Sequence, residues 1–329
     1  MSNAAASPSL VRRALTYGIF PAVFFGSLLA IYIANLKGVH LGIMVPATTV
    51  TAGAFILVFE RIHPYIGWWN ETQGDVGTDI MHAIVSMGIV PNLFNALVTG
   101  SLYAFGAWLA GRVGTELWPA SWPIVIQLAM AMIITEFPSY WVHRWMHEHD
   151  SLWRLHATHH SAPRLYFLNA ARFHPLDTLA QHSLQIAALA IMGAPEVVMA
   201  LFVVWTSVHG MFQHANINMK LGPLNWIFSM AELHRWHHSR TIEESQANYG
   251  ANIIFWDLVF GTYFFPKDRM PPEQIGIEGM PNFPANYVGQ ILSPFRWKRV
   301  VAESSETPAT PPADATIVES PGAERQPAG

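Results

Sequence analysis

The sequence predicts an all-α protein that is embedded in a membrane as a helical bundle of about four spans. Hydrophobic residues make up 51% of the 329 residues and charged residues only 12%, whereas soluble domains carry about 25% charged residues. The mean hydropathy is positive, at +0.25. Several apolar runs are long enough for a helix to cross a bilayer, which takes about 20 residues.

Four apolar runs follow one another along the chain. The first begins after Arg12-Arg13 and is longer than the core of a signal peptide. The second follows almost at once across Lys37-Gly38, which predicts an uncleaved helical hairpin. The third is broken at Pro91, as one kinked span or a short helical pair, and the fourth is expected to kink at Pro138. The spans are expected near residues 15–36, 39–59, 79–110 and 122–145.

A further apolar stretch, residues 179–208, is interrupted at Gly193-Ala194-Pro195. Each half is short for a full crossing, so a re-entrant hairpin and two spans both remain open. We expect the integral-membrane domain to cover residues 1–301. Residues 302–329 are rich in Pro, Ala, Ser, Thr and Glu, which predicts a disordered tail.

Basic residues set the expected orientation, because cytoplasmic loops carry an excess of Lys and Arg. Lys37 and Arg112 fall on one side of the four-span arrangement. The other side carries more basic residues and most of the 16 histidines. We therefore expect the histidines in a cytosolic helical cap. The basic residues on that side are Arg12, Arg13, Arg61, Arg144, Arg154, Arg164 and Arg172.

The composition excludes several classes of function. The formal net charge of −4 gives no basic footprint for nucleic acid. The chain contains no cysteine, which excludes disulfides, iron–sulfur clusters, thiolate metal sites and cysteine nucleophiles. Imidazole is therefore the strongest transition-metal ligand that the chain offers.

Three of the four histidine clusters have helical spacing. His143 and His147 are four residues apart, and Glu136 and Tyr140 extend their stripe along one helix face. The motif His-x-x-His-His occurs twice, with spacings of three and four that place the rings of each copy on one helical face. The two copies are His156, His159 and His160, and His234, His237 and His238.

The remaining cluster, His209 and His214, has a different spacing. The two residues are five apart, which a regular helix places well out of line. The pair needs a helix end, an irregular turn at Gly210, or a single ligand.

These clusters favour a metal centre over packing. A lone histidine pair is more often part of a core or a membrane interface, but each neutral ring must satisfy two nitrogens, and two copies of one motif are hard to explain that way. Ten clustered histidines exceed the ligands of one zinc and suit two metals; nitrogen ligands with open positions suit redox-active iron. Candidates for orienting the rings are Glu136, Asp177, Asn216, Glu232 and Asn248.

Together the motifs resemble the fatty acid hydroxylase / sterol desaturase superfamily. The resemblance runs from about Trp68 to Phe265 and includes HRWMH, LWRLHATHHS, RFHPLD, FQHANI, LHRWHHSR and NYGANIIFWDLVFGTYF. It implies a four-span bundle with a cytosolic site for two iron ions (Fe2+), and oxidation of a lipid with O2 as co-substrate. The ligands it implies are His143, His147, His156, His159, His160, His209, His214, His234, His237 and His238.

The resemblance also bears on three further histidines. His82 and His174 lie near the family pattern and are expected to support the ligands, whereas His149 has no place in it and is expected on the surface. The spacing of His209 and His214 is wider than in some members, which weakens the assignment of His209 more than that of His214.

By analogy, the favoured activity is hydroxylation of a fatty acyl chain or of an aminolipid such as ornithine lipid. A sterol- or hopanoid-type desaturase or methyl oxidase is the alternative. Short loops and the lack of a fused cytochrome b5-like domain indicate a bacterial inner-membrane protein. The sequence gives no indication of oligomeric state.

Electrons are expected from a ferredoxin or cytochrome-type partner, because the chain contains no GxGxxG fingerprint and no haem-attachment motif. Several arginines either dock that acidic carrier and lipid headgroups or only follow the topology rule. They are Arg144, Arg154, Arg164, Arg172, Arg235 and Arg240.

Two other classes of protein compete with an oxygenase. A membrane zinc hydrolase would need a general base beside the metal, usually in HExxH, and His147-Glu148-His149 lacks that spacing. A metal or proton transporter would place ionisable residues within several spans, whereas these clusters fall at predicted span ends.

Overall fold

The computed structural model describes residues 9–305. These residues form helices and three isolated β-bridges, which confirms the all-α class. The last helix, α13 (Trp297–Ser305), takes in the first four residues of the predicted tail. The rest of that tail, residues 306–329, lies outside the described residues.

Five helical segments are long and apolar enough to cross a membrane, one more than the sequence predicts. The additional segment is the second half of the interrupted stretch. The five are α1 (Leu10–Leu36), α2 (Leu41–Ile62), the continuous segment Val76–Val113, α5 (Ile124–Glu148) and α8 (Glu196–His214). Together with the buried histidine clusters, these segments make the chain an integral membrane protein.

The segment Val76–Val113 is one continuous helical span rather than a helical pair. It consists of α3 (Val76–Met81), a π-helical stretch η2 (His82–Ile89) and α4 (Val90–Val113). Pro91 is the second residue of α4, and only Val90 separates it from the π-helical stretch. Because proline has no backbone N–H and crowds the preceding turn, the wider π-helical turns accommodate it without ending the helix.

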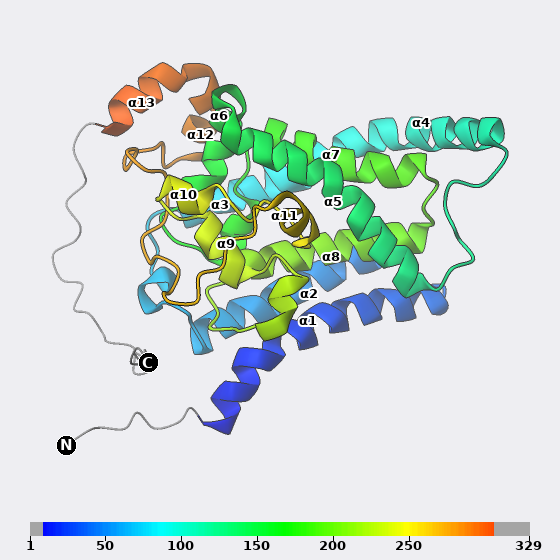
Figure 1. Cartoon of the computed structure of the whole chain (residues 1–329), viewed down its shortest axis with the longest axis horizontal. Helices are drawn as coiled ribbons and strands as arrows, with labels where there is room; N and C mark the ends of the chain where they lie inside the picture. The colour runs from blue at the N-terminus through cyan, green and yellow to red at the C-terminus, as the bar shows by residue number, and fades with distance from the viewer. Residues whose placement is uncertain (1–8, 306–329) are drawn as a thin grey trace.

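The interrupted stretch forms a helical hairpin within the bundle. Its first arm, α7 (Pro175–Ile191), packs against α4 and α5, and its second arm, α8, packs against α1 and α2. The connection lies at the end of the bundle opposite the cap (Figure 1), where Gly193 has φ 76°. Gly106 lets α4 approach α7 closely, since a Cβ there would lie 2.0 Å from the Ile191 carbonyl oxygen.

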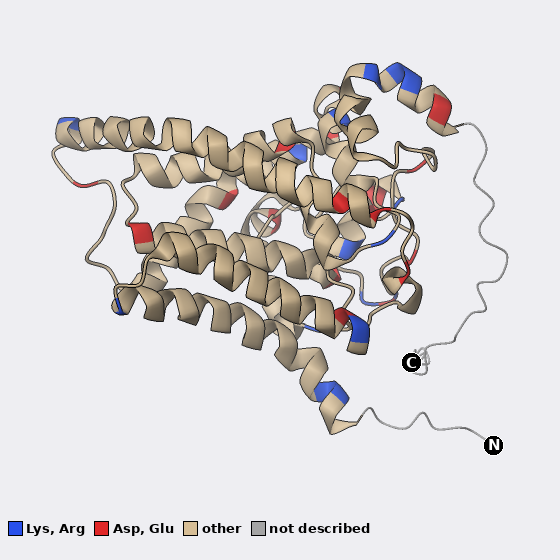
Figure 2. Cartoon of the chain, turned by 180° about the vertical axis from the view of Figure 1, so that it is seen from behind, with Lys and Arg blue, Asp and Glu red and all other residues tan. Residues whose placement is uncertain are grey.

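Short helices form a cap at the other end of the bundle, where α2, α5 and α8 finish (Figure 1). Charged residues gather mainly at that end, and the long helices carry few of them (Figure 2). The helices of the cap are α6 (Asp150–His160), α9 (Ala231–His237), α10 (Ile242–Ser245), α11 (Phe255–Phe260), α12 (Tyr287–Leu292) and α13, with the 3-10 turns η1 (Gly67–Asn70), η3 (Phe167–Ala171), η4 (Gly222–Trp226) and η5 (Ser293–Arg296).

Candidate metal centre

Three helices bring the repeated histidine motifs together beneath the cap. The C-terminal end of α5 carries His143 and His147, and its buried face continues through Tyr140 and Glu136 as the spacing predicts. The two His-x-x-His-His motifs lie at the C-terminal ends of α6 and α9. All eight histidines of these motifs are buried, with at most 9% of each residue exposed.

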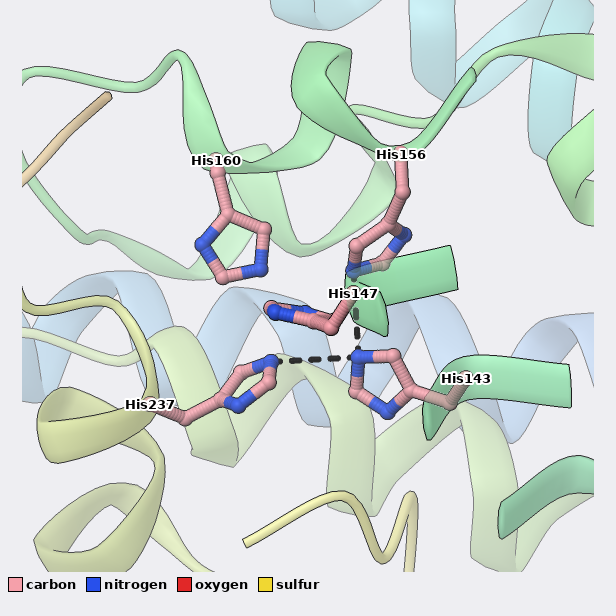
Figure 3. Close-up of side chains that lie close together, drawn as sticks. All are labelled: His143, His147, His156, His160 and His237. Atoms are coloured by element: carbon pink, nitrogen blue, oxygen red, sulfur yellow. Dashed lines mark hydrogen bonds between the residues drawn. The ribbon is translucent and has the colours of Figure 1, made fainter. Parts of the chain in front are cut away.

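The histidines form two separate groups, which divide both copies of the repeated motif between them. The five-histidine group contains His143, His147, His156, His160 and His237 (Figure 3). The four-histidine group contains His159, His214, His234 and His238. Within each group, one ring nitrogen of every member lies within 4.8 Å of the others.

Partners at Nδ1 fix the ring protons of three members of the five-histidine group. His143 Nδ1 donates to the Tyr249 carbonyl oxygen over 2.7 Å, and His237 Nδ1 donates to the Ala247 carbonyl oxygen over 2.8 Å. His156 Nδ1 donates to the Asp177 carboxylate over 2.8 Å. In a neutral imidazole only one nitrogen carries a proton, so each Nε2 presents a bare lone pair.

These lone pairs point at one another. His143 Nε2 lies 3.0 Å from His156 Nε2 and 3.1 Å from His237 Nε2 (Figure 3). Neutral rings have no proton to place between these nitrogens, so a cation is needed to satisfy them. Two nitrogens bound to one ion at right angles, each about 2.1 Å from it, lie about 3.0 Å apart, so the separations fit a shared metal ion.

The four-histidine group is fixed less completely. His159 Nδ1 donates to the Arg172 carbonyl oxygen over 3.3 Å, and His214 Nδ1 donates to Asn169 Oδ1 over 2.8 Å. The Nδ1 atoms of His234 and His238 have no partner. The Nε2 atoms again converge, with His234 3.0 Å from His214 and His238 3.1 Å from His159.

Burial keeps these ligands in the form that binds metal. Loss of solvent, reinforced by neighbouring imidazoles, lowers the pKa of His160, His237 and His238 well below the ordinary histidine value. The rings are therefore neutral at physiological pH, as a metal ligand must be. His147 Nε2 and His160 Nε2 are buried without a hydrogen-bond partner. Each of the two buried sets of nitrogen donors could thus hold a transition metal ion.

Carboxylates hold the elements that orient the five-histidine group. Asp177 is fully buried and also accepts from Gln181 Nε2 over 2.7 Å. Although burial raises its pKa, His156 and Gln181 lower it below the usual value, so Asp177 is ionised. The sequence places Asp177 among the residues expected to support the ligands, and the structure places its carboxylate on His156.

The Tyr249 and Ala247 carbonyls belong to a loop that is held from three sides. Asp257 accepts from the backbone N–H groups of Tyr249 and Gly250, over 2.8 Å each, and Glu136 accepts from the N–H of Asn252 over 2.8 Å. Asn248 has φ 55° and donates through Nδ2 to the Phe264 carbonyl over 2.8 Å. Glu136 and Asn248 therefore act through the loop and not on a histidine.

The turn η3 supports the four-histidine group and is fixed by groups that sequence reasoning missed. Glu60 accepts from the N–H of Phe167 over 2.7 Å, and Asp79 accepts from Arg172 Nε over 2.5 Å and from Tyr166 Oη over 2.6 Å. Arg164 pairs with Asp75 over 2.9 Å. The available signal was the presence of acidic residues at span ends, where an unpaired charge is costly.

Three arginines assigned to docking are placed elsewhere. Arg164, Arg172 and Arg235 are only 1–3% exposed, so of the two alternatives left open for them, docking of an acidic carrier is wrong. Arg164 and Arg172 bridge α3 and η3, and Arg235 Nη2 donates to the carbonyls of Ala215 and Ile217. Buried arginine needs such partners because an unpaired buried charge costs several kcal/mol.

His209 is the predicted ligand that the structure does not bring to either group. It lies on α8 in a cage of Phe20, Phe24 and Phe228, with ring centroids 6.1–6.3 Å away. Both of its ring nitrogens lack a partner. The five-residue spacing from His214 is the reason, because a regular helix turns the two side chains to different faces.

Other predicted supporting residues lie away from the rings. His82 donates through Nδ1 to the Phe173 carbonyl over 2.9 Å, and His174 donates through Nε2 to the Ile291 carbonyl over 3.1 Å. Asn216 pairs with the backbone of Ile66, and Glu232 accepts from the N–H of Leu221. His149 is exposed, as predicted. These groups join segments of the cap rather than orient a ligand.

A cavity of about 390 Å³ leads from the histidines into the bundle. At one end it is lined by members of both groups, His143, His156, His159, His214 and His234. From there it is bounded by side chains of α2, α4, α5, α7 and α8, all of which except α7 belong to the segments of membrane length. Among the described residues, no Asp, Glu, Lys or Arg lines it. An apolar chain therefore fits the cavity while reaching both metal sites.

Comparison with known proteins agrees with this architecture. Residues 128–262 match the family described as fatty acid hydroxylase. The chain is 35% identical to the ornithine lipid hydroxylase OlsE of Rhizobium tropici, over 89% of this chain and 87% of that protein. No solved structure gives a significant match.

Two more distant relatives share part of the chain. Human alkylglycerol monooxygenase is 27% identical over 69% of this chain and 50% of its own length. The Delta(7)-sterol 5(6)-desaturase ERG3A of Gibberella zeae is 28% identical over 66% of this chain and 59% of its own length. All three relatives are named for the oxidation of a lipid.

Proposed function

This chain belongs to the fatty acid hydroxylase family, and on that premise we propose that it hydroxylates a C–H bond of an aminolipid of the ornithine-lipid kind. The observation that carries the proposal is the meeting of two buried, all-imidazole groups with a cavity to which the described residues contribute no charged side chain. The extent of similarity to an ornithine lipid hydroxylase favours an aminolipid over a sterol.

We propose iron as the metal of both groups, as the family implies. The proposed ligands are His143, His147, His156, His160 and His237 for one ion and His159, His214, His234 and His238 for the other. When bound, the irons supply the activation of O2 and the removal of hydrogen from an unactivated C–H bond. His209 is left out of the ligand set because it contacts neither group.

The chain's own residues position the substrate and protect the reaction. The histidine end of the cavity is roofed by η3 and the loop that contains Gly250 and Asn252. Apolar side chains such as Phe173 and Phe202 line the path of the lipid and exclude water. Asp177, Tyr249 and Ala247 keep the proton of three ligands on Nδ1, so that each Nε2 stays free for metal.

Electrons are proposed to come from a ferredoxin or a cytochrome-type protein that docks on the cap. Of the predicted docking arginines, Arg144, Arg154 and Arg240 remain partly or fully exposed. Opposite charge on a carrier would speed its association with this surface. With the cap on the cytoplasmic face, the excess of basic residues at that end follows the topology rule, and we propose a bacterial inner membrane as the location.

The competing classes lack support at the site. Both groups consist of imidazoles alone, with no carboxylate among their members. A zinc hydrolase would need a carboxylate free to act as general base beside the metal, but Asp177 is engaged by His156 and Gln181.

Lipid mass spectrometry under ¹⁸O2 tests the proposal. Cells that express the protein should contain an aminolipid heavier by one labelled oxygen, which is absent from cells that express His237→Ala. The purified protein should contain about two irons per chain. Loss of two hydrogens without added oxygen would instead establish a desaturase. Zinc-loaded protein with an unchanged lipid profile would refute the proposal.

A further inference from the structure

A second cavity lies in the cap, apart from the one that reaches the histidines. Its volume is about 140 Å³. The two cavities share no lining residue, and among the described residues no histidine lines the second one. Its polar and charged lining residues are Gln73, Asp75, Ser161, Arg172, Arg240 and Gln290. The second cavity is therefore a polar site distinct from the metal centre.

Arg172 brings an unpartnered donor to this cavity. Its Nε donates to Asp79 over 2.5 Å, but its Nη2 is buried without a hydrogen-bond partner. Nη2 lies 3.9 Å from Asp75 Oδ2, which is too far for a hydrogen bond. Arg172 is only 3% exposed, and a buried donor without an acceptor is costly. We therefore expect an acceptor to occupy the cavity.

Arg240 adds a second guanidinium to the same cavity. Its Nε donates to the Ile275 carbonyl oxygen over 2.9 Å, which holds the side chain against a lining segment. A Cβ on Gly276 would lie 3.6–3.7 Å from Arg240 Nε and Nη2, so the guanidinium lies close to the backbone of this lining residue. Arg240 is exposed, so a ligand can approach it from solvent.

The charges around the cavity leave one positive charge without a partner. Arg164 pairs with Asp75, whose two oxygens accept from Arg164 Nε and Nη2 over 2.9 Å each. Arg172 pairs with Asp79. Arg240 has no ion pair with any described residue. Although the Asp75 carboxylate lines the cavity, it is therefore neutralised, and the site as a whole attracts an anion.

The cavity lies outside the apolar layer of the membrane. Gln73 and Asp75 directly precede Val76, where a segment of membrane length begins at the cap end. Helix α3, which starts there, lies beside the short helices of the cap (Figure 1). An anion can therefore reach the cavity from solvent or from a lipid headgroup without crossing hydrocarbon.

We propose that Arg172 and Arg240 bind a phosphate group in this cavity. A phosphate presents several oxygens, so it can accept from two separate guanidinium groups, whereas one guanidinium already occupies both oxygens of a carboxylate. The phosphate comes either from a phospholipid headgroup or from free inorganic phosphate. The inference does not depend on which lipid the protein oxidises.

A bound phosphate would also support the metal centre from behind. The Arg172 carbonyl oxygen accepts from His159 Nδ1 over 3.3 Å, so the residue that binds phosphate through its side chain orients a histidine through its backbone. Arg172 is thus a positioning residue for the four-histidine group. Phosphate should accordingly raise the unfolding temperature of the protein, because a ligand that binds only the folded state stabilises it.

Calorimetry with three probes tests the site. The iron-loaded protein, in an uncharged detergent at fixed ionic strength, would be titrated with inorganic phosphate, with dihexanoylphosphatidylglycerol and with dihexanoylglycerol, which lacks the phosphate. We expect the wild type to bind a phosphate-bearing probe more tightly than dihexanoylglycerol. Arg240→Gln should weaken that binding about 10–100-fold, which is the worth of hydrogen bonds to a charged group.

Arg296→Gln is the matched control. Arg296 is an exposed arginine of η5 that does not line the cavity, so this variant removes the same charge from the cap but should bind all three probes as the wild type does. Arg240→Lys keeps the charge without the planar fork and should weaken binding less than Arg240→Gln. Phosphate bound to the irons would be unaffected by Arg240→Gln, so a loss in this variant assigns the binding to the cavity.

The relative affinities identify the source of the phosphate. Tighter binding of dihexanoylphosphatidylglycerol, lost in Arg240→Gln, would support a lipid headgroup; binding of inorganic phosphate alone would support free phosphate. Equal binding of dihexanoylphosphatidylglycerol and dihexanoylglycerol, with no binding of inorganic phosphate, would overturn the inference, since water would then satisfy Arg172. Phosphate binding that is unchanged in Arg240→Gln, with the unfolding temperature of the phosphate-free variant also unchanged, would overturn it too.

Discussion

The five-histidine and four-histidine groups lie side by side but differ in how their protons are fixed. In the first, a carboxylate and two backbone carbonyls hold three Nδ1 protons at 2.7–2.8 Å. In the second, the acceptors are the Asn169 amide and, at 3.3 Å, the Arg172 carbonyl, and two Nδ1 atoms have no partner. Convergent imidazoles alone therefore do not define equivalent sites.

This difference in proton placement indicates that the two groups differ in their affinity for a metal ion. In the five-histidine group, neutral rings leave no proton for the contacts between His143, His156 and His237. In the four-histidine group, the Nδ1 atoms of His234 and His238 have no acceptor, so one of these rings can carry its proton on Nε2 and donate it to a neighbouring ring; their 3.0 Å Nε2–Nε2 contact leaves room for one such proton. We expect the five-histidine group to hold its ion more tightly, also because Asp177 makes His156 a stronger donor.

Removal of one ligand from each group should give the largest effect. His237→Ala and His238→Ala should both abolish formation of the hydroxylated lipid. His238→Ala leaves three imidazoles and should lower the content to about one iron per chain, whereas His237→Ala leaves four and should retain more iron. Elemental analysis and lipid mass spectrometry measure both. The same loss of iron in both variants would show that the groups do not differ.

Asp177→Asn should sharpen the comparison through one group alone. The neutral amide still accepts from His156 but no longer makes the ring more basic, and such changes cost about 10–100-fold in metal affinity. During competition with a chelator, the wild type should lose iron first from the four-histidine group, whereas Asp177→Asn should lose it first from the five-histidine group. Iron analysis at increasing chelator concentration measures the change. Glu243→Gln, an exposed acid of the cap, should leave both affinities unchanged.

The pH dependence of stability should reveal the loop behind the five-histidine group. Burial raises the pKa of Asp257 to about 6, so between its unfolded value near 3.8 and pH 6 the folded state binds more protons than the unfolded state. Its contribution to the free energy of unfolding is therefore complete below pH 3.8 and declines, by at most about 1.4 kcal/mol per pH unit, as the pH rises through 6.

Asp257→Asn should remove this decline. Denaturant unfolding of the wild type and the variant between pH 4 and pH 7 measures the difference between their slopes. If the free energies of unfolding of the wild type and the variant differ by the same amount at every pH in that range, the slope does not come from Asp257.

His209→Phe should give the smallest effect. The ring belongs to neither group and has two unpartnered nitrogens among phenylalanines, so phenylalanine should leave iron content and turnover unchanged. Removal of a buried unsatisfied polar group should raise the free energy of unfolding by about 1–3 kcal/mol. His214→Phe is the contrasting variant and should lose iron. Loss of iron in His209→Phe would return His209 to the ligand set.

Local features of the sequence were sufficient for the helical class and for most of the spans. Apolar runs near residues 15–36 and 39–59 became α1 and α2 because composition and length alone decide whether a helix can cross a bilayer. Helical spacing likewise placed His143 and His147 on one buried face of α5. Both properties depend on residues within a few turns of one another.

The sequence by itself therefore determined which imidazoles come together beneath the cap, apart from His209. The tertiary structure decided how they divide. His143 and His237 are 94 residues apart, and His159 and His238 are 79 apart. Which nitrogens meet depends on the angles and distances between packed helices. The periodicity of one helix contains no information about these angles and distances.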